Sequence, residues 1–314
     1  MTAIQTASIN AASLADITAM RASLNAAIFG GQVMAYPTTL DFRITDDEWA
    51  DTPGLYSIDR ATFDMEFGFQ TIAYKFNSTT YNGWLMLYHE AHGRDFACEA
   101  SKPIIGQLLM AGFDVVAMNM PLLGRNSKPV VDLPKHGPTK IISHNSVALV
   151  TPTYGNGLRF FLEPAMATVT WLADHYGGHF AMMGLSGGGW TTTMVAALDA
   201  KVLYSFQVAG SLPLNIRLLR DVGDWEQTLP GIKEIASYED LYVLGAVGGD
   251  RRRQLQMLTL HDECCFANDG ETYRYAVRER ALQLGGDWDF WLDDSHTDHA
   301  ISPAAMTKLF TYFE

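Results

Sequence analysis

A serine lies between glycines in the segment Gly184-Leu-Ser186-Gly-Gly188, which has the pattern G-x-S-x-G. A buried-strand run, 179–183, precedes this segment and a helix-like run, 190–198, follows it, so the pattern falls where a strand would turn sharply into a helix. Such a turn strains the backbone and brings its flanks close together, and glycine tolerates both because it has no Cβ atom. The pattern predicts that Ser186 is a nucleophile, with its hydroxyl beside a helix N-terminus that favours developing negative charge.

Length, composition and charge limit the class of protein. The 314 residues can form one large α/β domain or two small ones, and 48% hydrophobic and 18% charged residues are ordinary for a compact protein. The net charge of −13 argues against nucleic acid or an anionic membrane surface as a partner. The sequence has no apolar run long enough for a membrane span and no secretory signal pattern, so we expect a cytoplasmic protein.

Strand-like and helix-like runs alternate along the chain. Apolar or alternating runs predict strands at 61–67, 69–76, 84–88, 113–120, 179–183, 203–209, 253–260 and 287–292, the first two antiparallel. Helical spacing predicts helices at 6–29, 100–111, 158–176, 190–198, 273–284 and from about 302. Residues 121–157 are predicted to form a long loop.

These elements predict an α/β protein with a mainly parallel central sheet and helices on both faces. We expect a single domain over residues 1–314. Residues 1–35 would be an N-terminal helical extension, and residues 212–249, which are mostly helical in pattern, would be a small cap or lid insertion.

The serine elbow, a histidine-containing loop after an earlier strand, an acid after a later strand and a histidine before the last helix together resemble the α/β-hydrolase family, over about residues 60–314. In that family the catalytic triad follows the order serine, acid, histidine, which implies Ser186, Asp262 and His299 here. His296, three residues earlier, is the alternative base. Three acids are alternatives to Asp262: Glu263, Asp294 and Asp298.

The same chemistry needs two N–H donors that stabilise an oxyanion. The N–H of Gly187, directly after the nucleophile, would be one donor. The second would come from the loop at 89–93, where Ala91 and Glu90 are the candidates.

Metal and cofactor binding are not expected. His89 and His92 have the spacing H-x-x-H rather than H-E-x-x-H, and they lie in a predicted loop. The chain also lacks a phosphate-binding G-K-[ST] sequence and a G-x-G-x-x-G sequence after a strand. Cys98 and the adjacent pair Cys264 and Cys265 do not form a disulfide framework. The pair could form a vicinal disulfide, but two reduced, buried thiols are the favoured interpretation.

The sequence therefore predicts a serine esterase, a hydrolase that cleaves a carboxylic ester through an acyl-enzyme on Ser186 without a cofactor. A small-molecule or carbohydrate ester is the expected substrate. A peptidase or amidase, an acyltransferase and a noncatalytic binding module of the same fold are the alternatives, and homo-oligomerisation is left open.

Overall fold

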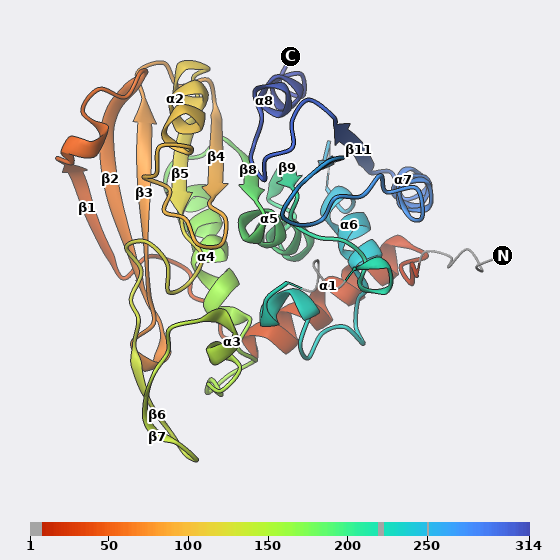
Figure 1. The fold of residues 1–314 in the computed structure, drawn as a ribbon, viewed down its shortest axis with the longest axis horizontal. Helices are drawn as coiled ribbons and strands as arrows, with labels where there is room; N and C mark the ends of the chain where they lie inside the picture. Colours follow the sequence, from red (N-terminus) through yellow and green to blue (C-terminus); the bar gives the residue numbers. More distant parts are fainter. Residues whose placement is uncertain (1–7, 219–222, 250) are drawn as a thin grey trace. The chain divides into compact units, whose positions relative to one another are not determined.

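The computed structural model describes residues 8–218, 223–249 and 251–314, which alternate strands with helices (Figure 1). The chain divides into two compact units. We call Ile28–Met183 the β1–β5 unit, and Met1–Ala27 together with Gly184–Glu314 the elbow unit. Residues 6 and 7 of the predicted N-terminal helix lie outside the described residues.

The strands of the β1–β5 unit follow the order β1-β2-β3-β5-β4, with β8 next. Their bounds are Thr39–Ile44 (β1), Leu55–Asp64 (β2), Gln70–Ser78 (β3), Trp84–His89 (β4), Asp114–Met118 (β5) and His179–Leu185 (β8). The pairs β1–β2, β2–β3 and β3–β5 are antiparallel, which confirms the predicted antiparallel start of the sheet, and β4–β5 is parallel. Two longer helices accompany these strands, α2 (Lys102–Met110) and α4 (Arg159–His175).

In the elbow unit, three parallel strands have helices on both faces. The strands are β9 (Val202–Val208), β10 (Arg253–Thr259) and β11 (Asp287–Asp293), and the helices are α5 (Gly187–Leu198), α6 (Tyr238–Ala246), α7 (Arg274–Gln283) and α8 (Pro303–Phe310). Successive side chains of a strand point to opposite faces. Accordingly, the amide oxygen of Gln207 accepts a hydrogen bond from the hydroxyl of Thr193 in α5. The ring of its neighbour Phe206 packs edge-on against Tyr312, just after α8.

Several elements differ from the sequence prediction. Helix α1 begins at Leu14 rather than near residue 6, because the Ser13 hydroxyl accepts the N–H of Asp16 and so caps the helix there. The chain before the cap is held by Asp240, whose Oδ1 accepts the N–H of Asn10 at 2.7 Å. Strand β1 was not predicted, because it is an edge strand whose residues are all at least partly exposed.

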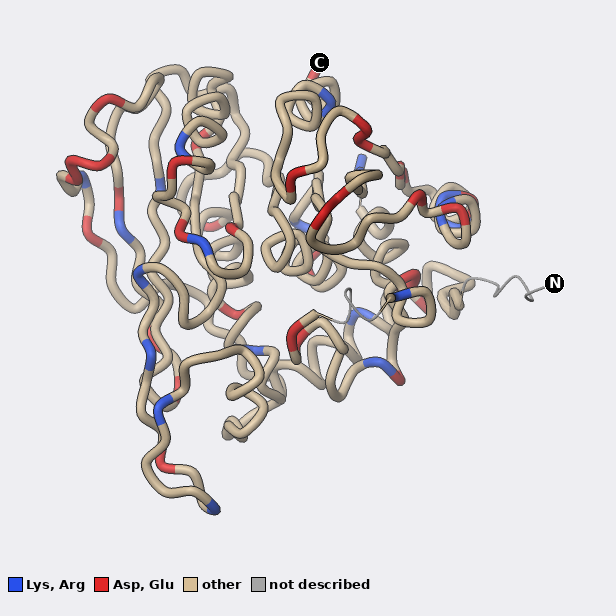
Figure 2. Tube along the Cα trace, viewed as in Figure 1, with Lys and Arg blue, Asp and Glu red and all other residues tan. Residues whose placement is uncertain are grey.

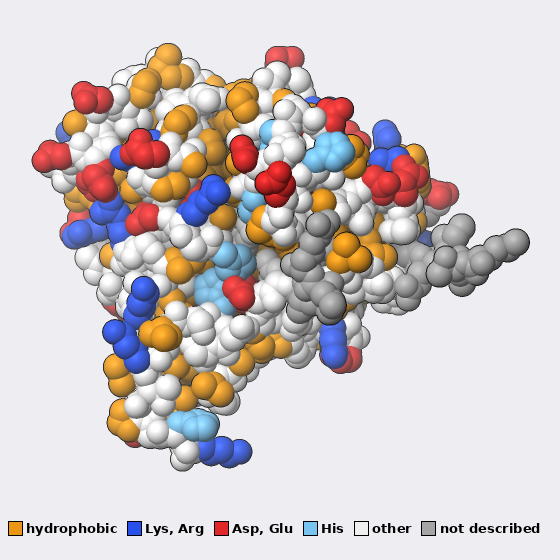
Figure 3. All heavy atoms as spheres, viewed as in Figure 1, with side chains coloured by type: hydrophobic (Ala, Val, Ile, Leu, Met, Phe, Trp, Pro, Cys, Tyr) orange, Lys and Arg blue, Asp and Glu red, His pale blue; other side chains and the backbone are white. Residues whose placement is uncertain are grey.

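The predicted long loop at 121–157 contains regular structure: a hairpin of β6 (Val130–Leu133) and β7 (Gly137–Lys140), followed by α3 (His144–Val147). Apolar side chains are exposed in this part of the molecule, among them Val130 at 62% and Ile142 at 64% (Figure 3). Among the described residues of 212–249, short turns at Leu214–Ile216 and Trp225–Thr228 precede α6. Helix α6 is buried and packs on α5 and β10, so it belongs to the helical layer of its unit.

Acidic residues outnumber basic ones by 35 to 22, and they are spread over strands, helices and loops of both units (Figure 2). The negative charge therefore does not mark a single site. Among the described residues, no helix is both long and apolar enough to cross a membrane.

Candidate active site

Ser186 lies between β8 and α5 in a backbone conformation that is rare for any residue except glycine, with φ 54° and ψ −117°. Its N–H donates to the carbonyl of Val208, the last residue of β9, at 2.8 Å, and its carbonyl accepts the N–H of Trp190. A serine held in such a conformation by hydrogen bonds on both sides is the expected backbone of a nucleophile elbow.

The glycines around Ser186 are required by close backbone contacts. A Cβ atom on Gly184 would lie 2.3 Å from the carbonyl carbon and oxygen of Gly188, and one on Gly189 would lie 2.9 Å from Cα of Gly210. Backbone atoms cannot move aside as a flexible side chain can. The turn therefore tolerates only glycine at positions 184 and 189, and Gly187 begins α5 directly after the serine.

Asp262 and His299 form a hydrogen-bonded pair. Nδ1 of His299 lies 2.7 Å from Oδ2 of Asp262, and Oδ1 of Asp262 accepts the N–H groups of Cys264 at 2.8 Å and Cys265 at 3.1 Å. Burial acts to raise the pKa of Asp262, but the hydrogen bond and charge of His299 and the two N–H donors outweigh it and keep the pKa below its usual value. Asp262 is therefore a buried carboxylate that can orient the imidazole.

A second acid–histidine pair accounts for His296. Its Nε2 lies 3.2 Å from Oδ2 of Asp293, the last residue of β11. The hydrogen bonds that the carboxylate of Asp293 accepts come from the N–H and hydroxyl of Ser295 and from the hydroxyl of Ser302, the N-cap of α8. Asp293 was missed in the sequence, where its place at the end of the last strand was the available signal.

The other candidate acids lie at the surface. Glu263, Asp294 and Asp298 are exposed. The backbone N–H of Glu263 donates to the carbonyl of Thr297 at 3.1 Å, which joins the loop of Asp262 to the loop of His299. Among these acids and Asp262, only Asp262 has a described hydrogen bond to His299.

The thiols of Cys264 and Cys265 lie in the loop next to the acid–histidine pair. Sγ of Cys265 is 3.7 Å from Nε2 and 3.8 Å from Nδ1 of His299. Cys264 is exposed and Cys265 half-buried, so the prediction that both thiols are buried is wrong. The reason is that the two N–H groups turn inward to Asp262, which leaves the side chain of Cys264 at the surface.

In the β1–β5 unit, the loop after β4 is organised by the buried side chain of Glu90. Its carboxylate accepts the hydroxyls of Tyr88 and Ser101 and the N–H of Ala91, the last at 2.8 Å. The backbone N–H of Glu90 donates to the carbonyl of Met118 at 3.0 Å. Both candidate loop donors therefore have hydrogen-bond partners within this unit.

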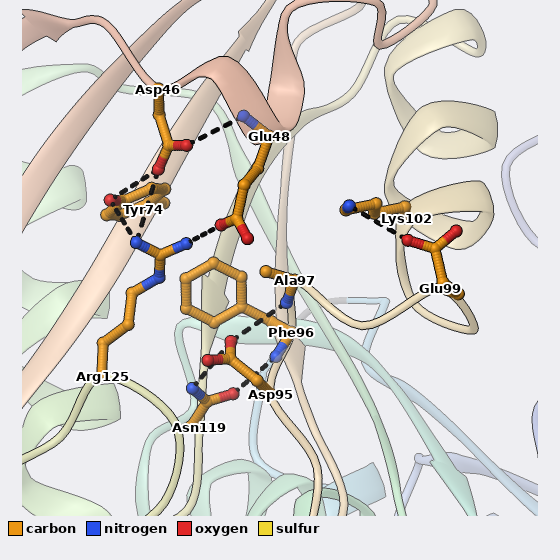
Figure 4. A network of polar contacts seen from close by, with 10 residues as sticks. All are labelled: Asp46, Glu48, Tyr74, Asp95, Phe96, Ala97, Glu99, Lys102, Asn119 and Arg125. Atoms are coloured by element: carbon orange, nitrogen blue, oxygen red, sulfur yellow. Dashed lines mark hydrogen bonds and ion pairs between the residues drawn. The ribbon is translucent and has the colours of Figure 1, made fainter.

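The same loop is anchored further along by polar bonds and a buried ring, as Figure 4 shows. Oδ1 of Asn119 accepts the N–H of Phe96 at 2.8 Å, while Oδ1 of Asp95 accepts the N–H of Ala97. The guanidinium of Arg125 lies over the rings of Tyr74, at 4.8 Å, and Phe96, at 5.7 Å. These contacts fix the loop that carries Glu90 and Ala91.

Three histidines of the β1–β5 unit, His89, His92 and His144, lie close to one another. His89 is fully buried, and burial lowers its pKa to about 4, an effect to which the charges of His92 and His144 contribute. The rings of His92 and His144 lie 4.8 Å apart, and Nε2 of His144 lies 2.9 Å from the carbonyl oxygen of Pro121. His89 is thus neutral at pH 7 and bonded through Nδ1 to the carbonyl of Glu90.

Ser186, Asp262 and His299 lie at one edge of the sheet in the elbow unit. Strands β9, β10 and β11 are parallel, so their carboxyl ends share an edge. Ser186 is bonded to the last residue of β9, Asp262 follows β10 by three residues, and His299 follows β11 by six. The carboxyl edge of a parallel sheet is where open α/β proteins place their ligands.

No protein-family model and no curated protein sequence matches the chain, but solved structures do. An acetyl xylan esterase from a Paenibacillus species is 11% identical with a TM-score of 0.60, over 98% of this chain and 96% of that chain. Acetyl xylan esterase 1 from a Thermoanaerobacterium species is 13% identical with a TM-score of 0.59, over 95% and 92%. An esterase from Pyrococcus furiosus is 12% identical with a TM-score of 0.56, over 90% and 98%.

At these identities the likeness establishes the fold. The chain has the α/β-hydrolase fold that its elbow and its order of elements predicted.

Proposed function

We propose that the protein is a serine esterase that hydrolyses a carboxylic ester through an acyl-enzyme on Ser186. The observation that carries the proposal is the 2.7 Å bond between Asp262 and His299 at the sheet edge where the strained Ser186 lies. A histidine held by a buried carboxylate is the base that a serine hydroxyl needs. Esterases among the structures of the same fold support this choice.

In the proposed reaction, His299 accepts the proton of the Ser186 hydroxyl as Oγ attacks the ester carbonyl. Nδ1 remains bonded to Asp262, so Nε2 is the nitrogen that takes the proton. The N–H of Gly187 is one of the two donors that stabilise the oxyanion. The second donor, for which the sequence offered Ala91 and Glu90, belongs to the other unit. His299 then protonates the leaving alcohol, and in the second half of the cycle it activates the water that cleaves the acyl-enzyme.

We propose a small-molecule or carbohydrate ester as the substrate. Two of the similar structures are named acetyl xylan esterases. An acetyl group on a sugar hydroxyl is therefore the first substrate to test, followed by esters of longer acids.

The experiment that tests the proposal is labelling with a fluorophosphonate probe, followed by peptide mapping of the modified residue. The label is expected on Ser186, and it should be absent from Ser186→Ala but present in Ser57→Ala, a serine of the other unit. A panel of p-nitrophenyl esters of rising chain length then measures acyl preference. Labelling of another residue with undiminished ester turnover by Ser186→Ala would overturn the mechanism.

A further inference from the structure

Three potential metal ligands converge beside the base. One ligand atom from each of Cys264, Cys265 and His299 lies within 4.8 Å of the other two. Thiolates and imidazole are the ligands that Zn²⁺ and Cd²⁺ prefer, in contrast to the oxygen ligands of Mg²⁺ and Ca²⁺. We propose that these side chains bind a soft divalent cation, and that the bound cation inhibits the esterase by occupying the nitrogen that must accept the serine proton.

The three ligand atoms are close enough together to reach one cation. Zinc lies about 2.3 Å from sulfur and about 2.0–2.1 Å from nitrogen in tetrahedral sites, which places a sulfur and a nitrogen ligand roughly 3.6 Å apart. Sγ of Cys265 lies 3.7 Å from Nε2 of His299 but also 3.8 Å from Nδ1, so the thiol must turn toward the lone pair of Nε2 before both can bind one cation. Cys264 is exposed, so its thiol can turn toward the cation without repacking the protein. Three protein ligands leave a fourth position for water.

Asp262 holds the ring of His299 and the backbone of both cysteines in place before a cation arrives. Asp262 bonds Nδ1 of His299 through one oxygen and the N–H groups of both cysteines through the other. A carboxylate on the far nitrogen of a metal-bound histidine is a recurrent arrangement that orients the ring. The bond at Nδ1 leaves Nε2 as the metal ligand.

A cation bound to Nε2 of His299 and catalysis by the same nitrogen exclude each other. This step rests on the proposed function. The lone pair of Nε2 can bind a cation or accept the proton of Ser186, but it cannot do both. Binding releases the two thiol protons to solvent and changes no oxidation state. Removal of the cation by a chelator therefore makes Nε2 available to accept the serine proton again.

The test is a titration of the purified, reduced protein with Cd²⁺, followed by ultraviolet absorption and by hydrolysis of p-nitrophenyl acetate. A thiolate-to-cadmium band should saturate at one cation per chain, with turnover reduced at least about tenfold and restored by chelation. Cys264→Ser and Cys265→Ser should each weaken binding at least about tenfold, whereas Cys98→Ser, in the other unit, should behave as wild type.

Failure of the inference can be told from failure of the proposed function. The band is also measured in Ser186→Ala, because binding does not need the nucleophile. An unchanged band in the Cys264→Ser/Cys265→Ser double variant would overturn the site, and saturation with full turnover would overturn the inhibition. If Ser186→Ala keeps its activity while the band forms as expected, only the serine mechanism is wrong.

Discussion

His299 is held by Asp262 and not by any of the acids closest to it in sequence. The contact of 2.7 Å spans 37 residues, whereas Asp294 and Asp298 point to the surface. The carboxylate is itself fixed by two backbone N–H groups, so the geometry of the imidazole depends on the loop after β10. This arrangement gives the first prediction.

Asp262→Asn should lower kcat by about 10³ to 10⁴ with little change in KM, because an amide can hold the imidazole in the wrong tautomer and cannot stabilise its positive charge. The matched control is Asp293→Asn, which alters the other acid–histidine pair, in which Asp293 lies 3.2 Å from Nε2 of His296. Steady-state kinetics on one ester measures both. If Asp262→Asn keeps more than about a tenth of the wild-type kcat while Asp293→Asn loses most of it, Asp293 and not Asp262 is the acid of the triad.

His299 and His296 should also differ in how much their removal lowers ester hydrolysis. His299→Ala should remove most ester hydrolysis, because it deletes the proposed base, while His296→Ala should retain most of it. Fluorophosphonate labelling gives a second readout, since Ser186 should lose reactivity in His299→Ala alone. The opposite pattern, with labelling lost only in His296→Ala, would identify His296 as the base.

The sequence predicted the elbow well because its requirements are local: a strand, a helix and glycines at fixed spacing. The order of Ser186, Asp262 and His299 followed from the family resemblance. The pairing of His296 with Asp293 could not be predicted from the sequence. It depends on how the loop after β11 turns back so that His296 approaches Asp293, the last residue of that strand. The exposed thiol of Cys264 was also missed, because residue type alone favours burial and the inward-facing N–H groups are a tertiary feature.

The elbow should fail when a single methyl group is added. Gly184→Ala would place its Cβ atom 2.3 Å from backbone atoms of Gly188, so we expect low soluble yield or a clearly reduced Tm, together with lost activity. Gly188→Val should have a similar effect, because the carbonyl of Gly188 lies against Gly184 and a β-branched residue is stiffer than glycine in this turn. Gly106→Ala is the control, since its Cβ would meet only Pro53 at an ordinary 3.6 Å and alanine favours the helix α2. A stable, active Gly184→Ala protein would contradict the elbow geometry.

Glu90→Gln should destabilise the loop after β4. The carboxylate accepts three hydrogen bonds in a buried place, and an amide NH₂ group cannot accept. Leaving one buried donor without an acceptor costs about 1–3 kcal/mol, which urea unfolding can measure. Glu99→Gln, whose side chain is 94% exposed, should change stability little. Equal stability of the two variants would show that the carboxylate of Glu90 does not organise the loop.

The last prediction concerns acid stability. Burial of His89 lowers its pKa from 6.5 to about 4, and the charges of His92 and His144 act in the same direction, while the bond to the Glu90 carbonyl opposes them. The unfolded chain therefore binds a proton at a higher pH than the folded chain does. Stability is lost as pH falls from 6.5 to about 4, and it does not depend on this group above that range.

Because one pKa unit corresponds to about 1.4 kcal/mol, His89 can account for a loss of up to about 3 kcal/mol over this range. The lowered pKa values of Asp262 and Asp293 act in a lower window, because their stabilisation is present above the usual carboxyl pKa of about 4 and is lost below it. The free energy of unfolding in urea can be measured from about pH 7.5 to about pH 4.5, a range that spans these pKa values. It should decline less for His89→Gln than for wild type. His136→Gln, an exposed histidine between β6 and β7, should decline as wild type does. If His89→Gln loses as much stability as wild type between pH 6.5 and 4.5, another group is responsible for the acid sensitivity.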